Sequence, residues 1–252
     1  MPFRLPTPVL VALIALAVAV LVALGVWQLQ RNAWRERAVA DRNARIVAAP
    51  LAVEAAARLP PAAVDYRPVT APGTWDHARA MVLGNRIRFG TKGEEIVEPL
   101  LLAPGGPAVL VNRGWYPAGE RDRALAGLAQ RDGEPAQGLA RYVEWLGGKQ
   151  TTAGTWTQIS PRDMGATLPY AVLPWYVVEG QLLPERAGHP SALPAQGFFA
   201  YASTTPHLQY ALTWFGLAAA LVTVAVLRFV VAPRRERARG QPPPRPDGGG
   251  AR

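Results

Sequence analysis

The 252-residue sequence contains no cysteine and only three histidines. The lack of cysteine excludes disulfides, thiolate nucleophiles and cysteine-ligated metals. His77, His189 and His207 are far apart and form no metal-binding spacing; we interpret the first two as surface residues. There is also no glycine-rich phosphate loop and no Gly-x-Ser-x-Gly nucleophile elbow. These absences predict that the protein is not an enzyme, with a membrane-bound hydrolase built from scattered residues as the less favoured alternative.

Lysine, arginine, aspartate and glutamate nearly balance in the middle of the chain, so most of the net positive charge lies at its ends. Of the net charge of +9, +6 lies outside residues 31–209. Most of this excess comes from five residues: Arg228, Arg234, Arg235, Arg237 and Arg239. A basic cluster beside an apolar segment is typical of a cytoplasmic flank attracted to anionic lipid. We therefore expect contact with membrane lipid and exclude nucleic acid as a partner.

Two long apolar segments lie near the ends of the chain. Residues 9–27 carry no charge, and residues 210–232 are interrupted only by Arg228. A 19-residue helix is about 28 Å long, close to the hydrocarbon thickness of a bilayer. We expect transmembrane helices over residues 9–29 and 209–232. The first segment ends without a small-x-small cleavage site, which favours an uncleaved anchor over a signal peptide.

The charges that flank the two segments predict their orientation. The arginines after the second segment place its C-terminus in the cytoplasm, whereas those after the first segment favour the opposite orientation. We give weight to the second segment, because long translocated domains obey the charge rule weakly. Residues 1–8 and a basic, disordered tail over residues 233–252 are then cytoplasmic, and residues 30–208 lie outside. Because the first span leaves no room for a transit peptide, we expect the bacterial inner membrane and a periplasmic domain.

The segment between the spans is expected to be mostly β-structure, after a polar helix over residues 31–47 lying over the membrane surface. Short runs of β-branched and aromatic residues bounded by Gly and Pro predict strands. The predicted strands cover residues 66–69, 79–83, 96–102, 108–112, 139–145, 155–159, 176–179 and 198–202; short helices are predicted over 120–129 and 161–166, and a hairpin over 84–93. The predicted fold is a two-helix transmembrane hairpin that carries an extramembrane, mostly β domain, barrel- or sandwich-like with minor α content.

One motif in this domain, Leu-Val-Asn-Arg-Gly-Trp-Tyr-Pro over residues 110–117, combines a strand pattern with turn residues. We expect the strand to end at Asn112, a turn to follow over Asn112, Arg113 and Gly114, and Trp115 to anchor it. Gly114 is expected to adopt a positive φ. We interpret the motif as a structural corner rather than a ligand site.

The outer membrane interface is expected to gather polar and aromatic side chains from both spans. His207, Tyr210 and Trp214 follow the i, i+3, i+7 spacing of one helix face. Such rings also form the aromatic belt of most spans, and His207 can simply occupy a helix start. The alternative is a haem-like ligand, because neutral imidazole is a common axial ligand of haem iron and Trp and Tyr rings pack against porphyrins. An antiparallel hairpin would place these residues beside Trp27, Gln28 and Arg31, whose guanidinium can pair with a propionate.

Three motifs occur in a characteristic order. Residues 25–31 read Gly-x-Trp-Gln-x-x-Arg, residues 111–117 read Val-Asn-Arg-Gly-Trp-x-Pro, and the second span opens at residue 207 with His-Leu-x-Tyr-Ala-x-Thr-Trp. Together they resemble the surfeit locus protein one family, the Surf-type assembly factors of cytochrome c oxidase. Ser-Thr-Thr-Pro over residues 203–206 departs from the family, whose members often carry Asn before the histidine.

The resemblance implies a haem chaperone that matures the haem a centres of oxidase subunit I. It implies that His207 ligates the iron. On this hypothesis we expect Tyr210, Trp214 and Trp27 to pack against the ring and Arg31 to pair with a propionate. Oxidase subunit I and haem a synthase are the partners expected on this basis. A scaffold for oxidase subunits that binds no haem stays open as the alternative.

Overall fold

The computed structural model describes residues 6–144, 147–184, 188, 190–200 and 206–239. It divides into two compact units, residues 1–38 with 203–252 and residues 39–202. The first unit holds the apolar parts of the two helices that are long and apolar enough to cross a membrane, and the first of these helices continues into the second unit. The second unit holds the strands.

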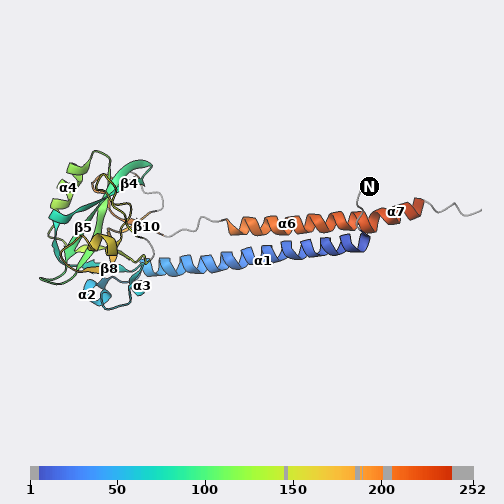
Figure 1. The fold of residues 1–252 in the computed structure, drawn as a ribbon, viewed down its shortest axis with the longest axis horizontal. Helices are drawn as coiled ribbons and strands as arrows, with labels where there is room; N and C mark the ends of the chain where they lie inside the picture. The colour runs from blue at the N-terminus through green and yellow to red at the C-terminus, as the bar shows by residue number, and fades with distance from the viewer. Residues whose placement is uncertain (1–5, 145–146, 185–187, 189, 201–205, 240–252) are drawn as a thin grey trace, which may run out of the picture. The chain divides into compact units, whose positions relative to one another are not determined.

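Helices α1 (Thr7–Ile46) and α6 (His207–Val226) run side by side in opposite directions (Figure 1). The less exposed positions recur every three or four residues, which is the 3.5-residue period of helices that pack along a common seam. Apolar side chains on the other faces are exposed, as in helices that face lipid. The seam positions are Ile14, Val18, Leu21, Gly25 and Gln28 on α1, and His207, Ala211, Phe215, Ala218 and Leu221 on α6.

Both apolar segments continue into polar helix. α1 runs without a break to Ile46, so residues 31–46 are helical as predicted and belong to the same helix as the first apolar segment. α6 leads through a π-helical turn, η2 (Leu227–Val231), into α7 (Ala232–Arg239). Residues 233–239 are therefore helical where a disordered tail was expected. The rest of that tail lies outside the described residues.

The second unit is built on one eight-stranded sheet in the order β1-β2-β7-β8-β6-β5-β3, with β4 also paired to β5. A separate two-stranded sheet joins β9 to β10. The strands are β1 (Leu51–Ala52), β2 (Pro68–Ala71), β3 (Thr74–Trp75), β4 (Met81–Arg88), β5 (Thr91–Leu101), β6 (Ala108–Pro117), β7 (Ala136–Arg141), β8 (Val172–Glu179), β9 (Leu182–Leu183) and β10 (Phe198–Phe199). The helices are α2 (Val53–Ala56), α3 (Pro61–Val64), the 3-10 turn η1 (His77–Arg79), α4 (Arg121–Ala129) and α5 (Pro161–Gly165).

The predicted barrel is wrong, because the large sheet is not closed among the described residues. Strand β1 ends it on one side, and β3 and β4 end it on the other. The pairing is mixed: β6 runs parallel to β8 and antiparallel to β5. Strand β6 is buried from Ala108 to Tyr116, so it forms the centre of the domain.

Most of the predicted strands overlap observed ones, and the helices at 120–129 and 161–166 are α4 and α5. The hairpin is also confirmed: β4 and β5 meet at Phe89 and Gly90, which have φ of 52° and 75°. Residues 155–159 form no strand; Trp156 makes only isolated bridges to Leu83 and Gln150. Residues 145 and 201–202, at the ends of two predicted strands, lie outside the described residues.

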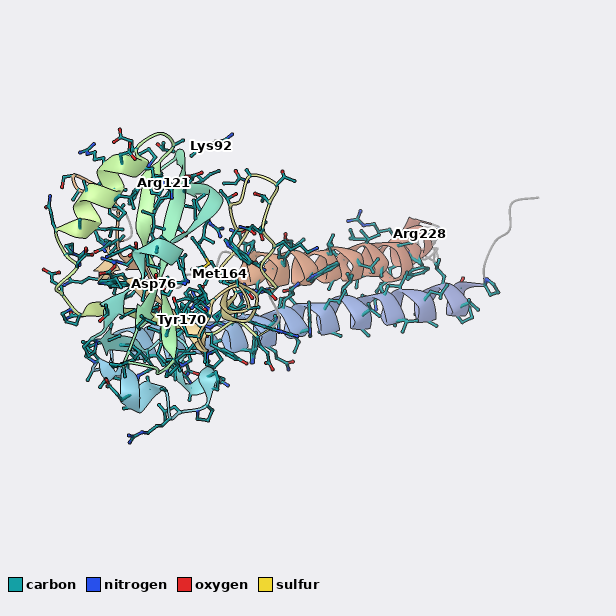
Figure 2. All side chains as sticks on the ribbon, turned by 60° about the vertical axis from the view of Figure 1, so that its left-hand side comes forward. Asp76, Lys92, Arg121, Met164, Tyr170 and Arg228 are labelled. Atoms are coloured by element: carbon teal, nitrogen blue, oxygen red, sulfur yellow. The ribbon has the colours of Figure 1, made fainter. Side chains whose placement is uncertain are left out.

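Short helices and connecting loops complete the core on the sheet. Met164 of α5 is fully buried and packs with Leu83, Val97 and Leu110 of the sheet. Close to α5 along the chain, the Tyr170 hydroxyl donates to the Asp76 carboxylate at 2.7 Å, and Figure 2 shows these two side chains near one another. This bond joins the segment before β8 to the segment before η1.

Candidate functional site

The histidine at the start of α6 is held by a side chain of the other span. His207 is only 8% exposed, and its Nδ1 lies 2.9 Å from Oε1 of Gln28. Its second ring nitrogen, Nε2, is buried and has no hydrogen-bond partner in the part of the chain that the structure describes. The imidazole is thus fixed at one nitrogen and unsatisfied at the other.

A glycine on α1 allows the two helices to pack closely near this pair. A Cβ added to Gly25 would lie 2.5 Å from Cε1 of Phe215, so the aromatic ring occupies the space that a side chain would need. Small residues on the seam of α6, Ala211 and Ala218, are also buried. Close approach of backbones at small residues is a common basis of helix association in membranes. Gln28 follows Gly25 by three residues on the same face, which directs its amide toward α6.

The remaining residues predicted for this site are less buried. Trp27 and Tyr210 are 54% and 50% exposed, and Trp214 is half-buried. The Arg31 guanidinium lies 4.4 Å from the ring centroid of Trp34, a residue outside the predicted set. The signal for Trp34 was its i+3 spacing from Arg31 on a helix. Of the predicted set, the structure shows a direct bond only between Gln28 and His207.

The donor chemistry of His207 fits an axial ligand of haem iron. A neutral imidazole whose Nδ1–H is engaged has a free lone pair on Nε2, which is the form that binds metals. Among the described residues, no group of three or more His, Asp or Glu side chains is arranged to hold a metal ion. The candidate donor is therefore this single imidazole, as in haem ligation.

The Asn-Arg-Gly motif of the domain is a bulge, not the turn that was predicted. Strand β6 continues through it, with Asn112 opposite Val97 and Gly114 opposite Ile96, so Arg113 is the extra residue. Gly114 has the expected positive φ, +125°. Its N–H donates to Asn112 Oδ1 at 3.0 Å, while Asn112 Nδ2 donates to Glu95 at 2.9 Å. A bulge re-aims a side chain without ending the strand.

The bulge directs Arg113 into a buried ion network. Its Nη1 and Nε lie 2.7 Å from carboxylate oxygens of Glu98 and Glu179, and its guanidinium lies 3.6 Å from the ring centroid of Trp75. Arg113 itself is fully buried. Burial raises the pKa of Glu179, and the neighbouring Arg113 opposes that rise. These contacts join neighbouring strands, and the motif alone could not identify them because the partners of Arg113 lie on other strands.

The network reaches the domain surface at two points. His77 Nδ1 lies 3.2 Å from Glu98, and Arg131 Nη2 lies 3.4 Å from Glu179. The His77 side chain is half exposed, in agreement with a surface residue. His189, also interpreted as a surface residue, lies outside the described residues.

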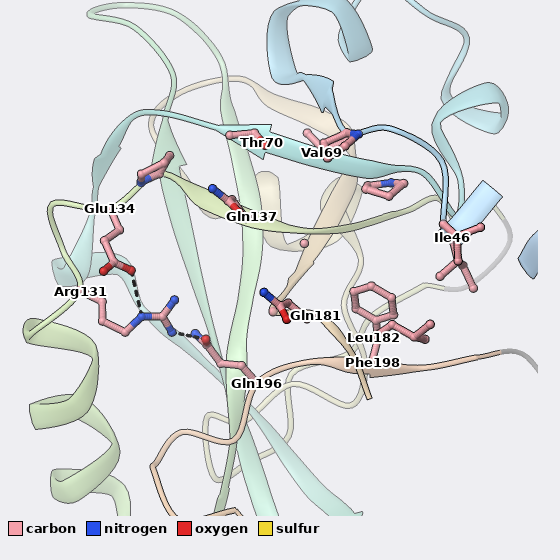
Figure 3. Close-up of a pocket in the computed structure, with 16 residues that line it drawn as sticks. Ile46, Val69, Thr70, Arg131, Glu134, Gln137, Gln181, Leu182, Gln196 and Phe198 are labelled. Carbon is pink, nitrogen blue, oxygen red and sulfur yellow. Dashed lines mark hydrogen bonds and ion pairs between the residues drawn. The ribbon is translucent and has the colours of Figure 1, made fainter. Parts of the chain in front are cut away.

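Beside Arg131, the domain contains an open cavity of about 670 Å³ (Figure 3). Arg131 is bonded there to Glu134 and Gln196, and the amides of Gln137 and Gln181 also line the cavity. Ile46, Leu182 and Phe198 provide apolar walls. Its lining comes from segments scattered along the sequence, so no local pattern indicated it.

Comparisons with known proteins cover both spans and the domain. The model of the SURF1 family matches residues 15–219. Surfeit locus protein 1 of Rattus norvegicus is 24% identical over 237 residues, which cover 82% of this chain and 71% of that protein. The SURF1-like protein of Drosophila melanogaster is 28% identical over 218 residues (78% and 70%), and that of Rickettsia felis is 25% identical over 227 residues (82% and 91%). The matched range includes Gln28, the Asn112–Trp115 bulge and His207. The chain belongs to the SURF1 family.

Proposed function

We propose that this chain is a non-enzymatic assembly factor of cytochrome c oxidase that binds haem a through His207 and aids its insertion into subunit I. Membership of the SURF1 family implies the assembly role. Haem binding is supported by one observation: a buried imidazole with Nδ1 bonded to Gln28 and Nε2 without a partner. An unpaired buried nitrogen is costly in a folded protein unless a ligand meets it.

Each residue near the pair has a distinct proposed role. His207 provides the lone pair of Nε2, and bound haem supplies an iron that accepts it. Arg31 lies three residues after Gln28, nearly one turn along α1, and offers its charge to a propionate. Trp27, Trp214 and Tyr210 offer ring surfaces on the exposed side of the helices. The exposure of these rings suits a ligand that must be released to a partner.

The proposed site requires a defined place in the membrane. We place the protein in the bacterial inner membrane with both termini cytoplasmic and residues 39–202 periplasmic. The antiparallel pair of apolar helices and the arginines after the second span support this orientation. Alkaline phosphatase and fluorescent protein fusions at each terminus and in the exposed β4–β5 hairpin test it. Fluorescence from the hairpin fusion would mean a cytoplasmic domain and would exclude delivery from the periplasmic side.

Haem binding is tested with two alanine variants of α6. Wild type, His207→Ala and Gln209→Ala are each produced together with a haem a supply, purified in detergent and compared by absorption spectra normalised to protein. Gln209 is an exposed residue on the same turn and serves as the matched control. Wild type and Gln209→Ala should retain haem a, and His207→Ala should lose it.

Two results would contradict this proposal. Equal haem a in all three proteins would remove His207 as the ligand. Absence of haem a from wild type, with oxidase assembly still dependent on the chain, would favour a scaffold for oxidase subunits. Haem a synthase and subunit I are the partners to seek by co-purification in either case.

A further inference from the structure

We propose that Gln28 is a positioning residue for His207 and fixes the tautomer in which Nε2 is the metal-binding nitrogen. The contact is a single bond between the two spans, from His207 Nδ1 to Gln28 Oε1 at 2.9 Å. The identity of the metal as haem iron rests on the proposed function. The tautomer is a property of the chain alone and is measured without haem.

The direction of the hydrogen bond determines where the imidazole proton lies. A neutral imidazole carries one proton, and an amide oxygen only accepts hydrogen bonds. A bond to Oε1 therefore places the proton on Nδ1 and leaves a lone pair on Nε2. The reversed amide would place the proton on Nε2, which would then be a buried donor without a partner. Buried N–H groups without partners are rarer than buried acceptors without partners, so the first arrangement is favoured.

The environment of Nε2 indicates a ligand rather than a purely structural bond. His207 is 92% buried, as follows from its exposure of 8%, and Nε2 itself is buried and unpaired among the described residues. A helix start that needed only a polar residue would leave this nitrogen in contact with water or with the protein. A metal is the natural partner for an imidazole lone pair whose other nitrogen is already fixed.

The position of Gln28 on the opposite helix gives it control over the orientation of the ring. The bond joins α1 to α6, so rotation of the imidazole away from the seam would break it. Gly25 and Phe215 hold the two helices in close contact on the same faces. In metal sites, removal of the acceptor that holds a ligating histidine lowers metal affinity about 10- to 100-fold.

The test is nitrogen NMR of haem-free, full-length protein in detergent at alkaline pH, with ¹⁵N-labelled histidine. The chain has only three histidines, so the His207 signals are assigned by their loss in His207→Ala. Wild type should show a protonated Nδ1 and an unprotonated Nε2. Gln28→Glu keeps an oxygen acceptor and should keep this pattern, whereas Gln28→Leu should shift the proton toward Nε2. Gln30→Leu, the same change at an exposed position of α1, should match wild type.

A haem a titration of the same variants provides the second measurement. Gln28→Leu should bind haem a about 10- to 100-fold more weakly than wild type, and Gln28→Glu and Gln30→Leu should bind within a few-fold of it. Two NMR results would overturn the positioning role, whatever haem affinity is measured. One is a proton on Nε2 of His207 in wild type, and the other is a tautomer that stays the same in Gln28→Leu. The proposed function fails separately if His207→Ala binds haem a as well as wild type does. If the tautomer still changes in Gln28→Leu, the role of Gln28 in positioning the imidazole stands even then.

Discussion

Arg113 Nε lies 2.7 Å from Glu179 Oε2, and this buried bond joins the central strand β6 to its parallel neighbour β8. The same guanidinium reaches Glu98 on β5, so one side chain ties three adjacent strands together. Removal of one member of a buried ion network leaves uncompensated charge, which costs far more than loss of a surface pair.

Arg113→Met should therefore destabilise the domain by about 3–5 kcal/mol, because two buried carboxylates lose the buried guanidinium and keep only their longer contacts to His77 and Arg131. The measurement is guanidinium unfolding of the full chain in detergent, followed by tryptophan fluorescence. Arg123→Met, at an exposed i,i+3 pair of α4, is the control and should change stability by less than about 0.5 kcal/mol. Addition of Glu98→Gln and Glu179→Gln to Arg113→Met should recover part of the loss; no recovery would contradict a charge-based explanation.

Gly114→Ala should destabilise the domain by at least about 1 kcal/mol, because residue 114 has a φ of +125° that side chains rarely adopt. The new Cβ would also lie 2.8 Å from the backbone oxygen of Ala195. The same unfolding measurement applies. Gly133→Ala, at a glycine with open space around it and no positive φ, should be nearly neutral. Equal effects of the two variants would show that the bulge imposes no strain.

Gly25→Leu should separate α1 from α6, because its side chain would occupy the space of the Phe215 ring. Overpacking of this kind costs about 1–3 kcal/mol. The measurement is bismaleimide crosslinking between two introduced cysteines, Gln28→Cys and His207→Cys, in a chain that otherwise contains none. Protease cleavage within the domain then separates the two helices unless they are crosslinked. Gly25→Leu should reduce the crosslinked fraction, and Gly25→Leu with Phe215→Ala should restore it. Gly216→Leu, where a Cβ meets nothing within 4 Å, is the matched control.

Asp163→Asn should destabilise the protein at neutral pH and have a smaller effect in acid. The Ser160 hydroxyl and the Gly148 N–H donate to the Asp163 carboxylate and lower its pKa below 3.8 in the folded state. Because the pKa of Asp163 is lower in the folded state, its ionised carboxylate stabilises the fold at pH values above the pKa of the unfolded state. This stabilisation is lost as the pH falls through the folded-state pKa. The difference in Tm between wild type and Asp163→Asn should therefore narrow below about pH 4. A difference that stays constant down to pH 2 would contradict this sign.

The sequence is most informative where the signal is local. The two long apolar runs are sufficient to predict α1 and α6, and the cluster of Gly84, Gly90 and Gly93 is sufficient to predict the β4–β5 hairpin. The antiparallel alignment of the two spans also predicts that Gln28 approaches His207. Residue spacing cannot predict which ring nitrogen of His207 bonds to the Gln28 amide, because that depends on how the two side chains rotate.

The errors come from contacts between distant parts of the chain. The parallel pairing of β6 with β8 joins residues more than sixty positions apart and leaves no mark on either strand alone. The polar Arg113 resembled a turn residue because its partners, Glu98 and Glu179, lie on neighbouring strands. Trp156 has a strand-like neighbourhood, but it makes only isolated bridges to Leu83 and Gln150, so the segment around it forms no strand.

Strand β8, the parallel neighbour of β6, is translated much later than β6 itself. Val109 and Val111 are fully buried, yet the edge of β6 that β8 covers stays uncovered until Val172–Glu179 has left the ribosome. The apolar centre of the domain therefore cannot close until most of the chain has been translated, shortly before the second span begins at His207. Until then the nascent chain exposes an unpaired strand edge that is prone to aggregation, so chaperone protection of the nascent chain is expected for this period.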